Sequence, residues 1–257
     1  PKEGSDVYPY NDDGTRDFLD GVPFREPFVG VPWVAAQTES IRFSTSILKL
    51  AIRQPAVVAK QLTSLGCLAE GRFAFGVGIS PWPEDFMACQ IDWATRGKRM
   101  NEMLDILTGL MSGDYFGYDG EIFQLDAIKL TPVPKKKIPI LLGGHAAPAL
   151  RRAARQCDGW IAAGATIEEY KTWIDTINEH RKMYERDHLP FEVQVMSADA
   201  FSLPGLEALG KIGVDEVHIA FHDPYSAEVD TKTVEEKIGM LNWYSETFIQ
   251  PCREKIG

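Results

Sequence analysis

The sequence predicts an α/β fold in which six strands alternate with helices along the chain. Apolar or β-branched runs recur between segments of helical periodicity, and three of these runs (IPILLGG, GWIAA and VDEVHIAF) are almost wholly apolar. Such runs are typical of parallel strands that are covered on both faces. The 257 residues, 44% of them hydrophobic, are enough to bury a full core. Regular alternation of this kind leaves a doubly wound sheet or a barrel.

The first half of the chain opens with polar residues rich in Gly, Pro and Asp over residues 1–27, which predicts a long loop. A short helix is expected over residues 28–38. Pro55 suits the first turn of a second helix, and Gly71 suits its end. The dipeptide Asp119-Gly120 predicts a hairpin. The expected strands of this half span residues 41–48 and 72–79, and its longer helices span residues 54–70 and 96–111.

The second half repeats a shorter unit of strand, loop and helix. Strands are predicted where apolar runs follow turn residues, and helices where apolar residues recur on one face. The expected strands span residues 138–144, 159–163, 191–196 and 214–221. The expected helices span residues 148–156, 167–186, 205–212 and 233–248.

Composition limits the classes of function. The formal net charge of −10 disfavours a nucleic-acid partner, and the basic run at 135–137, between two prolines, predicts a solvated loop. The four cysteines are scattered, which disfavours disulfides, and Cys67 and Cys157 are expected to be thiols within helices. The sequence has neither a signal peptide nor an apolar run of membrane-spanning length, so we expect a cytoplasmic protein without a membrane partner.

Small residues dominate the ends of the predicted strands, where α/β barrels carry their active sites. Gly143-Gly144 ends one strand and opens a helix, and Gly164-Ala165-Thr166 does the same one unit later. Exposed amide groups at a helix start bind anions, so the two loops together predict a phosphate site. His145 stands beside the first loop as either a neutral hydrogen-bond donor to an anion or a helix cap.

The Gly76-x-Gly78 pair invites a dinucleotide-binding interpretation, which fails because position 81 is Pro and no acidic residue follows at the required distance. Trp82 either forms the wall of a ligand site or anchors a loop. Glu84 and its neighbour Asp85 either donate protons or are solvated loop carboxylates.

His222, after the last predicted strand, either acts as an acid or base or lies on a surface loop. His180 and His188 are expected to face solvent. The sequence contains no metal-binding motif and no G-x-S-x-G motif, so neither a metal centre nor a serine hydrolase is predicted.

Two long stretches resemble the luciferase-like flavin and deazaflavin oxidoreductases, within a similarity that runs from about residue 8 to residue 255. The first is IRFSTSILKLAIRQPAVVAKQLTSLGCLAEGRFAFGVGI, and the second is IPILLGGHAAPALRRAARQCDGW. The resemblance implies one domain over residues 1–257 with a TIM (β/α)8-type barrel. The YPYNDDG start and Arg96-Gly97 are similar to the branch that uses coenzyme F420, a deazaflavin.

The resemblance also implies roles for particular residues. Ser46-Ile47 matches the position of a non-proline cis peptide bond that bulges against the cofactor ring. The GVG stretch matches residues beside that ring, and the two Gly-containing loops match the phosphate-binding loops. We therefore expect the cofactor to contact Ser46, Ile47, Gly76, Val77, Gly78, Gly143, Gly144, His145, Ala163, Gly164 and Thr166.

The chain departs from the family pattern at two places. Pro81 stands where sugar-phosphate dehydrogenases of this branch have Glu, which disfavours that substrate. The family has two more strands upstream, so the barrel is expected to lack its first two strands in this chain. We expect about 40 further residues before Pro1, on the basis of roughly 30 residues per barrel unit. Without them, the strands over 41–48 and 214–221 become open edges, covered by a partner or by residues 1–27.

The predicted function is an oxidoreductase that transfers a hydride between coenzyme F420 and a small organic substrate. Two alternatives stay open: an FMN-dependent luciferase-like monooxygenase, and a flavin-binding protein without catalysis. A homodimer is expected. The catalytic group is not identified by the sequence, and the candidates are Trp82, Glu84 and His222.

Overall fold

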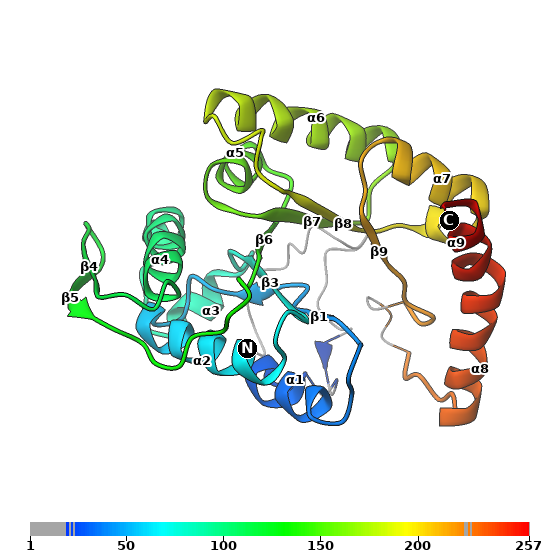
Figure 1. Ribbon diagram of the computed structural model, residues 1–257, viewed down its shortest axis with the longest axis horizontal. Coiled ribbons are helices and arrows are strands. Elements are labelled where there is room, and N and C mark those ends of the chain that lie inside the picture. The colour runs from blue at the N-terminus through cyan, green and yellow to red at the C-terminus, as the bar shows by residue number, and fades with distance from the viewer. Residues whose placement is uncertain (1–18, 21, 23, 224–225, 227, 257) are drawn as a thin grey trace. The chain divides into compact units, whose positions relative to one another are not determined.

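The computed structural model describes residues 19, 20, 22, 24–223, 226 and 228–256 (Figure 1). The YPYNDDG stretch and most of the predicted N-terminal loop lie outside these residues. The chain divides into two compact units. The first contains Phe24–Ile161 and Asp175–Glu192, and the second contains Ala162–Ile174 and Val193–Gly257.

The first unit is built around strand β3 (Phe73–Gly78), every residue of which is buried. On one side β3 pairs in parallel with the short strands β1 (Phe43–Ser44) and β2 (Leu48–Lys49). On the other side it pairs in parallel with β6 (Ile140–Gly143), which in turn pairs with β7 (Gly159–Ala163). The predicted parallel pairing of apolar strands is therefore confirmed for this unit.

The predicted strand over residues 41–48 is interrupted, which corrects the sequence prediction. Thr45 leaves the ladder and donates a hydrogen bond from Oγ1 to the carbonyl oxygen of Gly76, at 2.7 Å. The peptide bond between Ser46 and Ile47 is cis, as the family resemblance predicts. Pairing resumes at Leu48, which is opposite Val77.

Helices of the first unit follow the predicted periods, with one addition. They are α1 (Pro27–Ala35), α2 (Pro55–Leu68), α3 (Pro83–Ala88), α4 (Arg96–Leu110) and α5 (Ala147–Gln156), with a short 3₁₀ turn over Trp93–Thr95. The α3 segment was predicted to be a loop, and that prediction is wrong. Pro83 at its first position and two carboxylates in its first turn are ordinary helix-start signals.

The predicted hairpin is present as the antiparallel strands β4 (Phe116–Asp119) and β5 (Gln124–Ile128). Its turn is fastened to α4 by Glu102, which is only 8% exposed. The carboxylate of Glu102 accepts hydrogen bonds from the amides of Glu121, Ile122 and Phe123. Figure 1 shows the hairpin beside α4.

The second unit contains the parallel pair β8 (Glu192–Met196) and β9 (Glu216–His218). Its helices are α7 (Leu203–Lys211), α8 (Val234–Tyr244) and α9 (Gln250–Ile256), with a 3₁₀ turn over Ala198–Phe201 and a π-helical turn over Ser245–Ile249. Helix α6 spans Ile167–Met183. Strand β9 is shorter than the predicted strand over 214–221, and the last helical stretch continues past the predicted end at 248.

Helix α8 begins as predicted because Thr233 and Glu236 form a capping box. Within the described strands, β1 and β2 pair with β3 alone and β9 pairs with β8 alone, so the two predicted edges are edges here. All four cysteines are unpaired thiols. Among the described helices, none combines the length and the hydropathy that crossing a membrane requires.

Candidate functional site

Ile47, the residue before β2, forms an apolar step over the ends of two neighbouring strands of the first unit, β3 and β6. A Cβ atom added to Gly78 would lie 2.1 Å from Cδ1 of Ile47, and one added to Gly143 would lie 2.6 Å from it. Both distances are too short for a real contact, so the two glycines leave the space that the Ile47 side chain occupies. Ile47 is still 40% exposed. It therefore presents an apolar surface where β3 and β6 end.

Gly76 is required by the backbone. An added Cβ atom would lie 1.8 Å from the carbonyl oxygen of Thr45, so only glycine fits between the two strands. Val77 is fully buried. The ring contacts expected of Gly76 and Val77 stay predictions, because packing alone accounts for both residues.

The start of α5 is open. Gly144 has a φ of +106°, a conformation that favours glycine, and its carbonyl oxygen accepts a hydrogen bond from Nε1 of Trp160 at 2.8 Å. The N-cap residue is Ala146, which follows the exposed His145, and its side chain makes no capping hydrogen bond. Pro148 has no amide hydrogen, and the amide of Ala149 donates to the carbonyl oxygen of Ala146 at 2.7 Å. In the first turn of α5, the amide of Ala147 is therefore the donor left for a ligand.

The start of α6 is closed by its own side chain. The amide and the hydroxyl of Thr166 donate hydrogen bonds to Oε2 of Glu169, at 2.9 and 3.0 Å. The amide of Glu169 donates back to Oγ1 of Thr166 at 3.3 Å. This is a T-x-x-E capping box, a signal that the sequence analysis missed. The phosphate contact expected of Ala163, Gly164 and Thr166 stays a prediction, and at Thr166 it requires Glu169 to move.

A polar network that the sequence did not predict lies after β3. Ser80 is only 2% exposed. Its hydroxyl donates to Oδ2 of Asp85, and the amide of Trp82 donates to Oγ of Ser80 at 3.1 Å. The ammonium of Lys49 lies 2.5 Å from the same oxygen of Asp85. The solvated-loop interpretation of Asp85 is therefore wrong: the residue lies in α3, with its side chain 23% exposed and ion-paired.

The proton-transfer candidates are in different parts of the chain. Trp82 is the N-cap residue of α3, and Glu84 lies in the first turn of that helix, with its Oε2 atom buried. His222 is half-buried and follows Phe221 in the second unit. In the described part of the chain, no group of three His, Cys, Asp or Glu side chains could hold a metal ion.

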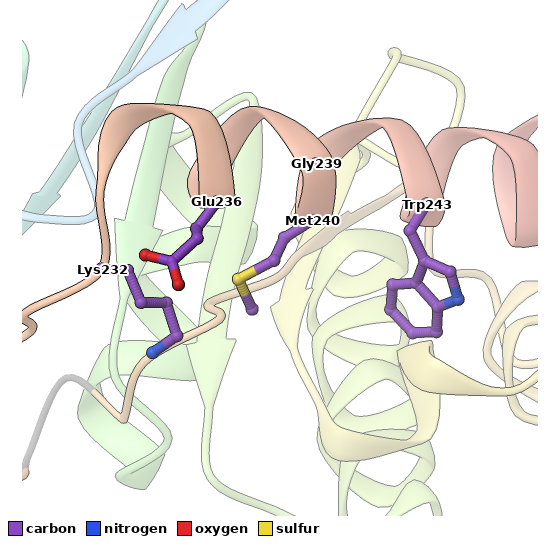
Figure 2. A pocket seen from close by; sticks show the side chains of 5 residues that line it. All are labelled: Lys232, Glu236, Gly239, Met240 and Trp243. Carbon is purple, nitrogen blue, oxygen red and sulfur yellow. The ribbon is translucent and has the colours of Figure 1, made fainter.

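Two surface cavities are lined by other residues. One cavity, of about 390 Å³, lies on α8 and is lined by Lys232, Glu236, Gly239, Met240 and Trp243 (Figure 2). Another, of about 590 Å³, is lined by residues of α4, the β4–β5 hairpin and α5, with Arg186. Neither includes a residue expected to bind the cofactor, so the candidate site is the group of strand ends around Ile47 and the start of α5.

Comparison with known proteins shows the family of the chain. The sequence profile of the luciferase-like monooxygenase family matches residues 10–201. An uncharacterized protein of Mycobacterium tuberculosis (strain ATCC 25618 / H37Rv) is 43% identical over 249 residues, which cover 97% of this chain and 86% of that protein.

Two relatives whose names state an enzymatic activity are also similar. The F420-dependent glucose-6-phosphate dehydrogenase of Gordonia bronchialis is 30% identical over 63% of this chain and 50% of its own length. The FMNH2-dependent dimethylsulfone monooxygenase of Pseudomonas fluorescens is 32% identical over 55% of this chain and 43% of its own length. The aligned part of the chain thus spans about half of either enzyme or less.

Solved structures show the fold. The coenzyme F420-dependent tetrahydromethanopterin reductase of Methanopyrus kandleri has a TM-score of 0.65 at 13% identity, covering 75% of this chain and 81% of that one. A monooxygenase from Streptomyces bottropensis has a TM-score of 0.61 at 18% identity, covering 73% and 59%. These likenesses confirm the predicted TIM-barrel-type α/β fold. With 192 of its 257 residues inside the family profile (residues 10–201), the chain belongs to the luciferase-like monooxygenase family.

Proposed function

We propose that the chain is an oxidoreductase that transfers a hydride between coenzyme F420 and a small organic substrate. The observation that carries this proposal is the apolar step of Ile47 over Gly78 and Gly143, which ends where the open start of α5 begins. A flat ring and the phosphate that a ribityl chain joins to it need these two kinds of surface close to each other. The F420-dependent glucose-6-phosphate dehydrogenase among the relatives supports the same choice.

The residues present fit such a cofactor. Ile47 offers an exposed apolar side chain to a ring, and the amide of Ala147 at the start of α5 offers a donor to a phosphate. Gly144, at its positive φ, brings the backbone close to that phosphate without a side chain in the way. When bound, the deazaflavin would supply the hydride chemistry, and the protein would supply binding and orientation.

Removing a hydride from an alcohol also releases a proton, which needs an acceptor. Glu84 is our candidate in the first unit, because one oxygen of its carboxylate is buried at the start of α3. Trp82, beside it, would wall the site and exclude water, and a dry site strengthens electrostatic interactions. His222, in the second unit, stays a prediction from the sequence.

Pro81 bears on the substrate. It stands at the family position of the Glu found in sugar-phosphate dehydrogenases, so we propose a small substrate other than a sugar phosphate. A second candidate function is FMN-dependent monooxygenation, which the similarity to the dimethylsulfone monooxygenase favours. A homodimer also stays a proposal, which light scattering would test.

Titration of the purified chain with oxidised F420 and with FMN tests the proposed function. We expect saturable binding of F420 that is tighter than that of FMN, followed by loss of the oxidised F420 absorbance when a secondary alcohol is added. Tight FMN binding without F420 binding would favour the monooxygenase. Binding without turnover over a panel of small alcohols and aldehydes would favour the non-catalytic alternative, and binding of neither would contradict all three.

A further inference from the structure

Lys49 occupies a defined place beside the candidate site. It ends β2 and pairs in register with Gly78, one of the two glycines beneath Ile47. Burial alternates along this segment: Ile47 is 40% exposed, Leu48 is 4% exposed, and the Lys49 side chain is 35% exposed. Residues two apart in an extended chain point to the same side. Ile47 and Lys49 therefore face away from the core that buries Leu48.

The ammonium of Lys49 has two neighbours, both from the segment after β3. It lies 2.5 Å from Oδ2 of Asp85, and 4.1 Å from the centroid of the Trp82 ring. A cation over the face of an indole is attracted by the negative charge of the ring face. Lys49 thus covers one face of the ring while its charge is balanced by Asp85.

The backbone of the same tryptophan is held independently. The buried hydroxyl of Ser80 accepts a hydrogen bond from the Trp82 amide at 3.1 Å and donates to Asp85. Asp85 therefore receives both Lys49 and Ser80 on one oxygen, and each of these two residues also contacts Trp82. Removing the carboxylate would release the restraint on the ring and the restraint on the backbone together.

We infer that Lys49 and Asp85 are positioning residues that fix Trp82 as the aromatic wall of the cofactor-binding site. The inference rests on the proposed function, because the wall matters only if a ring binds against Ile47. A plain tether between β2 and α3 would need the ion pair of Lys49 and Asp85 alone. A tether does not explain why the Trp82 indole lies against the Lys49 ammonium of that pair, on the exposed side of β2.

Acrylamide quenching of Trp82 fluorescence tests the inference in the ligand-free chain. The Trp82 signal is the difference between each variant and the same variant carrying Trp82→Phe. We expect Lys49→Met to raise the quenching constant of this signal about two-fold or more, because the ring loses the cation that covers it. Lys49→Arg, which keeps a cation for the ring, should restore the quenching of the natural chain.

Affinity supplies the second readout, with FMN and F420 as the probes. Lys49→Met and Asp85→Asn should each weaken binding about ten-fold, the size expected when a wall residue loses its alignment. Lys98→Met is the matched control, because Lys98 forms an exposed ion pair with Glu121 in the same unit. It should change neither readout. If Lys49→Met does not fold, Asp85→Asn carries both measurements.

The outcomes separate the inference from the proposed function. Unchanged quenching in Lys49→Met and Asp85→Asn overturns the positioning role, whatever the chain binds. If the quenching constant changes in these variants but the affinity for FMN and F420 does not, Trp82 is not a wall of the binding site, and the ion pair only tethers β2 to α3. If the natural chain binds neither FMN nor F420, the proposed function fails, and quenching alone then decides whether Lys49 and Asp85 hold Trp82.

Discussion

Two helix starts that look alike in sequence differ in structure. Each follows a buried strand and a glycine with positive φ, which is Gly144 before α5 (φ +106°) and Gly164 before α6 (φ +71°). The N-cap side chain of α5, an alanine, makes no capping hydrogen bond. At α6 the carboxylate of Glu169 accepts hydrogen bonds from Thr166. The first start is open to an anion, and the second holds an anionic group of its own chain.

The difference shows what the glycines alone do not decide. A glycine lets the backbone turn and approach a ligand, but the amides bind an external anion only if no nearby side chain occupies them. Glu169 occupies them and adds a negative charge that repels a phosphate. We therefore propose that the start of α5 is the main phosphate-binding position, and that the start of α6 has a structural role.

The largest expected effect comes from the side chains that hold the two loops. Trp160 is fully buried and donates a hydrogen bond to the carbonyl oxygen of Gly144. Tyr170 is also fully buried, and its hydroxyl donates to the carbonyl oxygen of Met196 at 2.7 Å and accepts from the amide of Ala165 at 3.3 Å. Trp160→Phe and Tyr170→Phe should each lower the free energy of unfolding by about 1–3 kcal/mol, measured by urea denaturation. Only Trp160→Phe should weaken FMN and F420 binding. Equal losses of affinity would remove the distinction between the loops.

Alanine substitutions at Gly144 and Gly164 give a closely matched pair of variants. An alanine at positive φ costs about 1–2 kcal/mol, so Gly144→Ala and Gly164→Ala should lower stability alike. Neither added methyl group meets a severe clash: the nearest atom at Gly144 is Cβ of Ala149 at 3.4 Å, and nothing lies within 4 Å at Gly164. Fluorescence titration should show affinity falling about ten-fold for Gly144→Ala only. A comparable loss for Gly164→Ala would place the ligand at both loops.

The cap of α6 is expected to have a smaller effect. Glu169→Ala removes the capping box and should cost about 0.5–2 kcal/mol in a thermal or urea melt. Glu169→Gln keeps an acceptor and removes the charge, so cofactor affinity should stay the same or rise a few-fold. If either variant binds F420 about ten-fold more weakly, Glu169 belongs to the binding site and the comparison is wrong.

The smallest effect concerns the other end of α5, where burial raises the pKa of Cys157 to about 12. The unfolded chain ionises this thiol near its ordinary pKa of 9.0, and the folded chain does not, so stability is present below pH 9 and falls as pH rises toward 12. Going from pH 7 to pH 9 should cost about 0.4 kcal/mol more in the natural chain than in Cys157→Ala. Equal pH dependence in urea melts of the two chains would show that the thiol is not buried.

Much of the fold was predictable because strands and helices have different periods. The run IPILLGG gave β6 and the start of α5 to within two residues. The break between β1 and β2 was harder to predict, because it depends on the hydrogen bond between Thr45 and Gly76, 31 residues away. Helix α3 was missed although Pro83 marks its start.

The candidate site was predictable only in part. The glycines beneath Ile47 were predicted from their small size and the family pattern, but the reason for them is contact with one side chain. The link between Lys49 and Asp85 joins positions 36 residues apart, and no local pattern indicates it. The capping box at the start of α6 is different: Thr166 and Glu169 are three residues apart, so the capping-box rule could have predicted it.

Amide chemical shifts during titration test the central claim most directly. The chain, labelled with nitrogen-15, would be titrated with F420, with FMN and with inorganic phosphate. We predict saturable shifts at the amides of Gly144, His145 and Ala147, at the start of α5, with the amide of Thr166 unchanged. Shifts at Thr166 without shifts at the start of α5 would contradict the account, because the phosphate would then lie where Glu169 closes the helix.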